Sequence, residues 1–353
     1  MLKKILATKV ALASIAFTFG QTESDSTKKS AFIISGSADV YFRHDFNKQI
    51  TNNRTSFTNT NNSFTLGMLS VKAERSIGKL DFVADIGLGK RAQEFSYNDS
   101  GTMAAIKQLY ISYSPIAALK ITAGTFATHM CYEVPDAYAN NNYSMSYIFS
   151  YGPFFSTGIK AEMNIGKKST LMIGVANPSD YKIANCSGKS FIAQFTTLLF
   201  NDNIKLYLNY NASRANDSTQ NDQGEVILNY TGLKNWTIGF DGTMAFVNHK
   251  MEESKWASSG KWFGNALYTN YTFTSLFSLA WRNEIFSDKN SITSAGINGN
   301  VFASTLSGNI KIKALTIIPE CRFEKADNNA FLNAAGNPTK SDASFLIAAI
   351  YKF

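Results

Sequence analysis

The strongest constraint on the fold is a repeated unit, an extended segment in which apolar and polar side chains alternate residue by residue. In residues 31–43, the even positions from Phe32 to Phe42 are apolar or small, and the odd positions from Ser35 to Arg43 are polar. Neighbouring side chains of a β-strand point to opposite faces, so each segment has one apolar and one polar face. About fifteen further segments follow, near residues 63–75, 80–88, 104–114, 117–127, 156–166, 169–177, 189–200, 203–212, 223–231, 235–248, 261–273, 275–287, 301–311, 313–325 and 342–353.

The connections between these segments alternate between short and long. Short ones lie at 76–78, 114–118, 166–168, 201–202, 231–234, 273–274 and around 312, and long polar ones near 46–62, 90–103, 127–155, 178–188, 211–222, 249–260, 288–300 and 326–341. Outer-membrane barrels sort their loops in this way, whereas a soluble sandwich has no reason to do so. In hydrocarbon every backbone N–H and C=O needs a partner within the protein, so the sheet must close. The sequence therefore predicts an all-β fold, a transmembrane antiparallel β-barrel of about 16 strands with short periplasmic turns and long extracellular loops.

The amino terminus predicts export. Lys3 and Lys4 precede an apolar run that ends near Phe19, and Gly20 is small at the expected cleavage point, as in a signal peptide of residues 1–20. A polar tail, residues 21–30, would then precede a barrel of residues 31–353 in the bacterial outer membrane. No stretch reaches 18 apolar residues, which argues against a helical membrane protein.

The amino-acid composition agrees with a lipid-facing surface and indicates few binding partners. Aromatic residues make up 13% of the chain and charged residues only 17%, which fits a barrel with aromatic girdles at both membrane interfaces. A net charge of +8 is too modest to indicate a nucleic-acid partner. The expected partners are outer-membrane lipid and, through the alternating last strand that ends in Phe353, the outer-membrane assembly machinery. A homo-oligomer is possible, but no segment marks a subunit interface.

A barrel of about sixteen strands is too wide for side chains to fill and typically encloses an aqueous channel. A charge facing lipid at mid-membrane would cost roughly 2–4 kcal/mol, so the charged side chains of the polar faces are expected to point inward. They either form a hydrated, ion-paired wall or set a field that selects solutes. The candidate pore-lining residues are Asp39, Arg43, Lys72, Glu74, Asp81, Asp85, Lys120, Lys160, Glu162, Lys205, Asp241, Arg282, Glu284, Glu320 and Arg322.

The longest connection, residues 126–155, is rich in Asn, Tyr, Ser and Phe, and Pro135 and Pro153 exclude a long helix there. It contains the motifs Thr128-His129, Tyr132-Glu133, Asn142-Tyr143-Ser144 and Ser150-Tyr151-Gly152-Pro153-Phe154, followed by Thr157-Gly158 and the basic Lys160. Together with the segments 36–41 and 106–111 upstream, these motifs resemble the OmpL-like β-barrel porin family (beta-barrel porin-2). One departure is Cys131, where the family usually has Gly.

The resemblance implies an outer-membrane porin, a water-filled channel for passive diffusion of small hydrophilic solutes. In porins of this size the third outer loop commonly folds into the lumen, and by that analogy residues 126–155 would form a constriction. The candidate constriction residues are His129, Tyr132, Glu133, Asn142, Tyr143, Ser144 and Tyr151.

The sequence gives little support to a metal site or an enzyme. His129, Cys131 and Glu133 alternate and could converge on a transition metal, but such triplets arise by chance, so no metal and no cofactor are expected. The three histidines have no nucleophile motif nearby, so no enzyme activity and no catalytic residue are predicted. Cys131, Cys186 and Cys321 match no disulfide framework. An adhesin or structural barrel with a plugged lumen remains the alternative, and conductance separates it from a porin.

Overall fold

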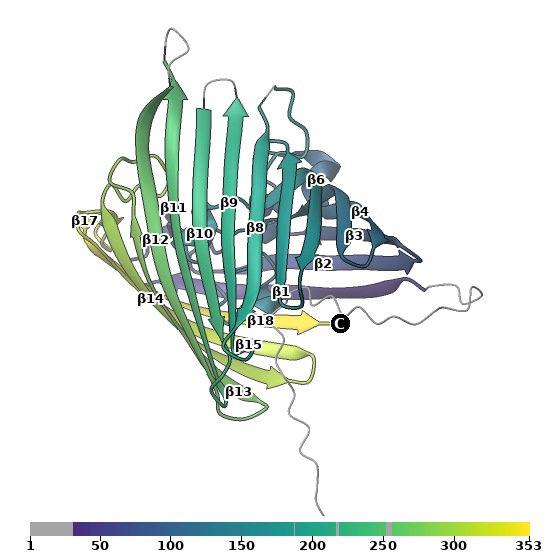
Figure 1. Ribbon diagram of the computed structural model, residues 1–353. Helices are drawn as coiled ribbons and strands as arrows, with labels where there is room; N and C mark the ends of the chain where they lie inside the picture. Colours follow the sequence, from purple (N-terminus) through teal and green to yellow (C-terminus); the bar gives the residue numbers. More distant parts are fainter. Residues whose placement is uncertain (1–30, 187, 217–218, 252–255) are drawn as a thin grey trace, which may run out of the picture.

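Sixteen antiparallel strands form a closed barrel (Figure 1). The computed structural model describes residues 31–186, 188–216, 219–251 and 256–353, so the expected signal peptide and polar tail lie outside the described residues. The barrel strands are β1 (Ile33–Asp45), β2 (Ser63–Ile77), β3 (Leu80–Leu88), β4 (Ile106–Ile116), β5 (Leu119–Ala127), β6 (Phe155–Ile165), β7 (Ser169–Ala176), β8 (Ser190–Leu199), β9 (Ile204–Asn216), β10 (Thr219–Tyr230), β11 (Trp236–Lys250), β12 (Trp256–Thr272), β13 (Phe277–Ser287), β14 (Asn300–Ile312), β15 (Leu315–Ala326) and β18 (Ser341–Lys352).

Each strand pairs with its neighbours in the chain, and β1 pairs with β18 to close the ring. The two shortest strands, β16 (Phe331–Leu332) and β17 (Pro338–Thr339), form a separate hairpin within one outer loop. The predicted barrel and its strand number are therefore confirmed.

The two faces of the barrel wall differ as the alternation predicts. In β14, Leu306 is 45% exposed, whereas its neighbours Thr305 and Ser307 are fully buried. A belt of exposed apolar side chains of this kind is what a membrane-spanning barrel presents to lipid.

The prediction of long loops near 211–222 and 249–260 was wrong, because paired strands extend into both segments. Strands β9 and β10 continue to Asn216 and from Thr219, and β11 and β12 run to Lys250 and from Trp256, so that these four strands rise above the rim in Figure 1. The residues there are polar on both faces, and a strand without an apolar face leaves no alternating pattern in the sequence.

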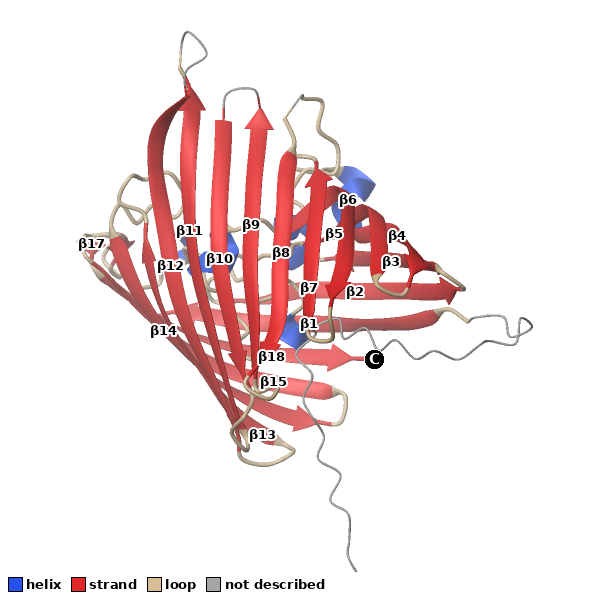
Figure 2. Ribbon diagram, in the orientation of Figure 1, coloured by secondary structure: helices blue, strands red, loops and turns tan. Residues whose placement is uncertain are grey.

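Short helices occur in the long connections between strands. They are η1 (Ile50–Asn52), α1 (Lys90–Phe95), η2 (Gly101–Ala105), η3 (Ala137–Ala139) and α2 (Tyr147–Tyr151), drawn blue in Figure 2 where they can be seen between the strands. Ser146 caps α2 by accepting a hydrogen bond from the Phe149 N–H. None of the helices in the described ranges is both long and apolar enough to cross a membrane.

Candidate functional site: the loop inside the barrel

Residues 128–154 join β5 to β6 and form the inner loop. Its backbone is held by carboxylates that project from the inner face of the barrel wall. The clearest case is Glu320 of β15, which is 2% exposed. Its Oε2 accepts the Tyr143 N–H at 2.7 Å and its Oε1 accepts the Ser144 N–H at 3.1 Å. A segment far from β15 in the sequence therefore lies against it inside the barrel.

Three more wall acids bind the loop backbone in the same way. Glu284 of β13 accepts the Tyr147 N–H at 2.7 Å. Asp241 of β11 accepts the Tyr132 N–H at 3.0 Å, and Glu225 of β10 accepts the Cys131 N–H at 3.0 and 2.8 Å. Each of the four acids satisfies at least one backbone N–H group of the loop, so together these contacts fix the loop against strands β10 to β15.

Two buried arginines bind the carbonyl groups of the same segment. Arg282 Nη1 donates to Ser144 O at 2.7 Å and forms an ion pair with Glu133 at 2.5 Å. Arg282 Nη2 and Arg322 Nη1 each donate to Met145 O at 3.1 Å. Since Arg282 is completely buried, its charge is balanced by the carboxylates around it rather than by water.

Aromatic side chains of the inner loop reach further strands. The Tyr143 hydroxyl donates to Asp39 of β1 at 2.5 Å, and the Tyr147 hydroxyl donates to Glu324 of β15 at 2.7 Å. Gly67 of β2 makes the first contact possible, because a Cβ there would lie 1.7 Å from an Asp39 oxygen.

Side chains from two outer loops brace the inner loop. The Arg91 guanidinium of α1 lies 4.8 Å from the centre of the Tyr143 ring and donates to Tyr143 O at 3.3 Å. Asp180, in the loop after β7, accepts the Phe154 and Phe155 N–H groups at 2.6 and 3.0 Å. Burial raises the pKa of the Asp180 carboxyl to about 6, although these amides, the Tyr97 hydroxyl and the Lys182 charge favour the ionised form.

The candidate pore-lining residues fall into two groups. Eight are buried: Asp39, Arg43, Asp85, Asp241, Arg282, Glu284, Glu320 and Arg322. Asp39, Asp241, Arg282, Glu284, Glu320 and Arg322 contact the inner loop, and Asp85 joins it through Lys107, whose Nζ lies 2.7 Å from Asp136. Arg43 instead binds Asp45 and the Thr60 carbonyl. The other seven are half-exposed and lie on β2, β3, β5, β6 and β9: Lys72, Glu74, Asp81, Lys120, Lys160, Glu162 and Lys205.

The remaining candidates of the inner loop have separate partners. His129 Nε2 lies 2.9 Å from Tyr210 O, Asn142 Nδ2 donates to Ser307 at 2.7 Å, and Tyr151 donates to Arg54 O at 2.6 Å. Among the described residues, no cluster of three or more His, Cys, Asp or Glu side chains is arranged to hold a metal ion.

Glu225, Lys107, Arg91 and Asp180 are among the residues that contact or brace the inner loop and were missed from the sequence. Glu225 stands on the polar face of a predicted strand, so the alternation could have identified it. Lys107 is in phase with the exposed Leu109 and Ile111, so the alternation places it on the apolar face; the pairing of β3 with β4 shifts register beside it, and the side chain is buried. Arg91 and Asp180 lie in outer loops, where no periodic pattern marks a buried charge.

Cys131 adopts a backbone conformation that favours glycine. Its φ angle is 74°, in the left-handed region. Glycine, which the resemblance leads one to expect at this position, has the lowest steric cost there. The Cys131 thiol lies half-buried beside Ile148.

Comparisons with known proteins agree on the architecture. Residues 31–353 match the family model described as "Putative beta-barrel porin-2, OmpL-like". OmpT of Vibrio cholerae is similar over 94% of this chain and 99% of its own, with 12% identity and a TM-score of 0.60. The outer membrane channel DcaP of Acinetobacter baumannii is similar over 92% and 97%, with 10% identity and a TM-score of 0.62. An anion-selective porin from Comamonas acidovorans is similar over 92% and 100%, with 11% identity and a TM-score of 0.60. No curated protein matches the sequence. At these identities the structural likeness shows the fold alone.

Proposed function

The chain belongs to the OmpL-like beta-barrel porin-2 family, and from this premise we propose that its inner loop sets the size limit of the channel. As a member of this family it is a porin of the bacterial outer membrane, which passes small hydrophilic solutes by diffusion. The family does not favour the alternative of an adhesin with a plugged lumen.

The observation that carries the proposal is the division of the inner wall. The charged side chains of β10, β11, β13 and β15 that contact the inner loop are buried, as are Asp85 of β3 and Lys107 of β4. A second group on β2, β3, β5, β6 and β9 stays half-exposed: Lys72, Glu74, Asp81, Lys120, Lys160, Glu162 and Lys205. The loop therefore takes up part of the barrel's cross-section, and solutes would pass between the loop and the half-exposed wall.

The half-exposed wall is nearly balanced in charge. Lys72 pairs with Glu74 at 2.8 Å, and Lys120 pairs with Asp81 at 2.8 Å. Lys160 and Glu162 lie 3.6 Å apart, and Lys205 adds a fourth lysine to three acids. Such a wall holds water along the channel, and its excess of one positive charge favours anions only weakly.

The proposal includes no covalent chemistry. His129, the histidine of the inner loop, contacts the Tyr210 carbonyl. Transport would then follow from the channel's width and hydration alone, without a catalytic step.

Loop deletion in planar bilayers tests the proposal. Removing residues 138–147 should raise single-channel conductance and let larger neutral sugars enter in liposome-swelling assays. A deletion of residues 334–337, in the exposed turn between β16 and β17, serves as the control and should leave both unchanged. The migration of unheated samples in gels checks that each barrel is folded. Unchanged conductance in a folded 138–147 deletion would remove the constriction role, and a folded wild type without conductance would favour the plugged barrel.

The proposed partners are outer-membrane lipid, the assembly machinery and further copies of the chain. One similar structure, of Vibrio cholerae OmpT, is described as a trimer form. Phe353 exchanges backbone hydrogen bonds with Gly36 at 3.0 Å, next to the seam between β1 and β18. Native mass spectrometry would show the oligomeric state, and Phe353→Ala should lower the yield of assembled barrel in cells.

A further inference from the structure

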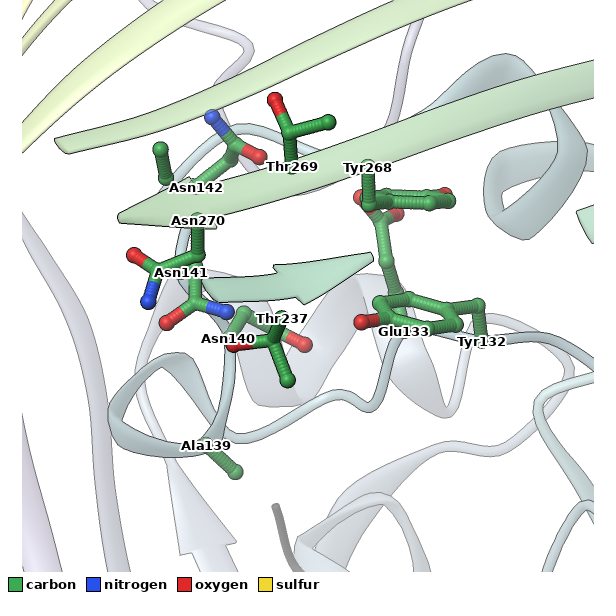
Figure 3. A pocket seen from close by; sticks show the side chains of 11 residues that line it. Tyr132, Glu133, Ala139, Asn140, Asn141, Asn142, Thr237, Tyr268, Thr269 and Asn270 are labelled. Carbon is green, nitrogen blue, oxygen red and sulfur yellow. The ribbon is translucent and has the colours of Figure 1, made fainter. Parts of the chain in front are cut away.

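A polar notch lies between the inner loop and the barrel wall (Figure 3). Tyr132, Asn141 and Asn142 line it from the loop, and Thr237 of β11 with Tyr268 and Asn270 of β12 line it from the wall. Figure 3 shows the two tyrosine rings at one end and the amide and hydroxyl groups of Asn141, Asn270 and Thr237 at the other. Its cavity volume of about 10 Å³ is the space of one water-sized group.

Two polar atoms at the notch have no hydrogen-bond partner within the described part of the chain. They are the hydroxyl of Tyr268, a residue that is 7% exposed, and the Oδ1 of Asn270. Buried polar atoms are rarely left without a partner, because burial removes their bonds to water. A missing group that bonds to them is therefore expected.

The tyrosine end of the notch is built by the wall. The Tyr132 and Tyr268 rings stack with centroids 4.1 Å apart and planes 17° apart. Gly239 of β11 leaves the room for this, because a Cβ there would lie 2.3 Å from Tyr132 Cε2. Asp241, two residues further on, holds the Tyr132 backbone.

We propose that the notch binds one hydroxyl group of a neutral polyhydroxylated solute, a sugar or a polyol, as it passes the inner loop. The proposal rests on the channel function, and it specifies the class of solute that would bind transiently during passage. A hydroxyl both donates and accepts, so it can donate to the Asn270 oxygen at one end of the notch or accept from the Tyr268 hydroxyl at the other.

Charged groups fit the notch less well. A carboxylate has no proton for the Asn270 oxygen and would approach Glu133, another residue of the notch lining. An ammonium group cannot accept the Tyr268 proton. The Glu133 charge is already paired with Arg282 at 2.5 Å, so it offers little attraction to a cation.

Three probes with the same sugar ring test this selectivity. Glucose is neutral, glucuronate carries a carboxylate and glucosamine carries an ammonium group. Each is added to wild-type channels in a planar bilayer, and the fall in ion conductance is followed against concentration. Glucose should reduce the conductance saturably, and the other two should need higher concentrations for the same reduction.

Tyr268→Phe removes the hydroxyl and keeps the stacked ring. It should weaken the glucose effect about fivefold, the value of roughly one hydrogen bond. Tyr271→Phe is the matched control, since Tyr271 lies on the same strand, has the opposite orientation and packs against Trp236. Gly239→Ala, which displaces Tyr132, provides a second variant should Tyr268→Phe fail to fold.

The outcomes separate the notch from the channel function. Any of three results would refute hydroxyl binding in the notch: a glucose effect that does not saturate, an effect equal for all three probes, or an effect unchanged in folded Tyr268→Phe and Gly239→Ala channels. In each case the measured ion conductance would still support the channel function. If the folded wild type does not conduct, the channel proposal fails, and calorimetry with glucose in detergent then decides the notch alone. Binding that Tyr268→Phe weakens supports the notch, and binding that it leaves unchanged or no binding refutes it.

Discussion

Replacing Glu320 by Gln should loosen the inner loop without changing the shape of the wall. One carboxylate oxygen accepts both the Tyr143 N–H and the Ser307 hydroxyl at 2.7 Å, and the other accepts the Ser144 N–H at 3.1 Å. A glutamine keeps one accepting oxygen and presents an NH2 group in place of the other. If its oxygen stays with Ser144, the Tyr143 N–H faces another donor.

The magnitude follows from the bond that is lost. A hydrogen bond to a charged group contributes about 1.5–3 kcal/mol, and Glu320 is only 2% exposed, so water cannot take over its role. Taking about 2 kcal/mol, the population of the detached loop rises about 30-fold, since every 1.4 kcal/mol is a factor of ten. The other wall acids still hold the loop, so the barrel itself should remain folded.

Amide hydrogen exchange in detergent measures this population. The Tyr143 and Ser144 amides should exchange about 30-fold faster in Glu320→Gln than in wild type, while amides of β15 keep their protection. Glu162→Gln is the matched control, because it removes the same charge from a side chain that is 24% exposed and binds no loop amide among its contacts with described residues. Equal exchange at Tyr143 in wild type and Glu320→Gln would refute the view that this carboxylate holds the loop.

Three further predictions follow from the loop contacts. The folded-state pKa of about 6 at Asp180 lies above 3.8, so its stabilising contribution, about 3 kcal/mol, is complete below pH 3.8 and lost as the pH rises through 6. Asp180→Asn should flatten the pH dependence of exchange at the Phe154 amide, corrected for intrinsic rates, and an unflattened profile would contradict the assignment. Cys131 has a φ angle of 74°, so Cys131→Gly should leave the melting temperature of the barrel nearly unchanged, whereas Cys131→Val should lower it because a β-branched residue is strained there. Equal melting temperatures of the two variants would be inconsistent with this strain. Gly67→Ala should destabilise by about 1–3 kcal/mol in thermal unfolding by pushing aside the Asp39 carboxylate, whereas Gly224→Ala, with open space around its Cβ, should not.

The alternation of residues predicted the wall because a strand's two faces are set by its own local geometry. Leu306 and Ser307 are neighbours in sequence and must point to opposite sides, so their exposure could be assigned without knowing any contact. The same reasoning failed at residues 211–222 and 249–260, where polar residues occupy both faces of a paired strand.

The contacts of the inner loop could not be predicted from local pattern. Tyr143 and Glu320 are 177 positions apart, and the alternation says only that Glu320 points inward, not what it meets there. The alternation also could not separate the inward charges that stay half-exposed, such as Lys72 and Glu162, from those that the inner loop covers, such as Arg282.

The buried charges of the wall have a common physical role. An irregular backbone can be buried only if its N–H and C=O groups find partners, because it has no ladder of its own to supply them. Between Tyr143 and Tyr147 the N–H partners come from Glu320 and Glu284 of the wall and from Glu133 within the loop. The carbonyl partners come from Arg282 and Arg322 of the wall and from Arg91 of α1.

Main-chain groups thus account for much of the binding between loop and wall. A side-chain change within 143–147 that keeps the backbone path should then release the loop less than the loss of a single wall acid. Tyr143→Phe, which removes only the hydroxyl bond to Asp39, makes this comparison with Glu320→Gln direct. Hydrogen exchange at the Ser144 amide should rise less in Tyr143→Phe than in Glu320→Gln. The reverse order would mean that side chains, and not the backbone, hold the loop in place.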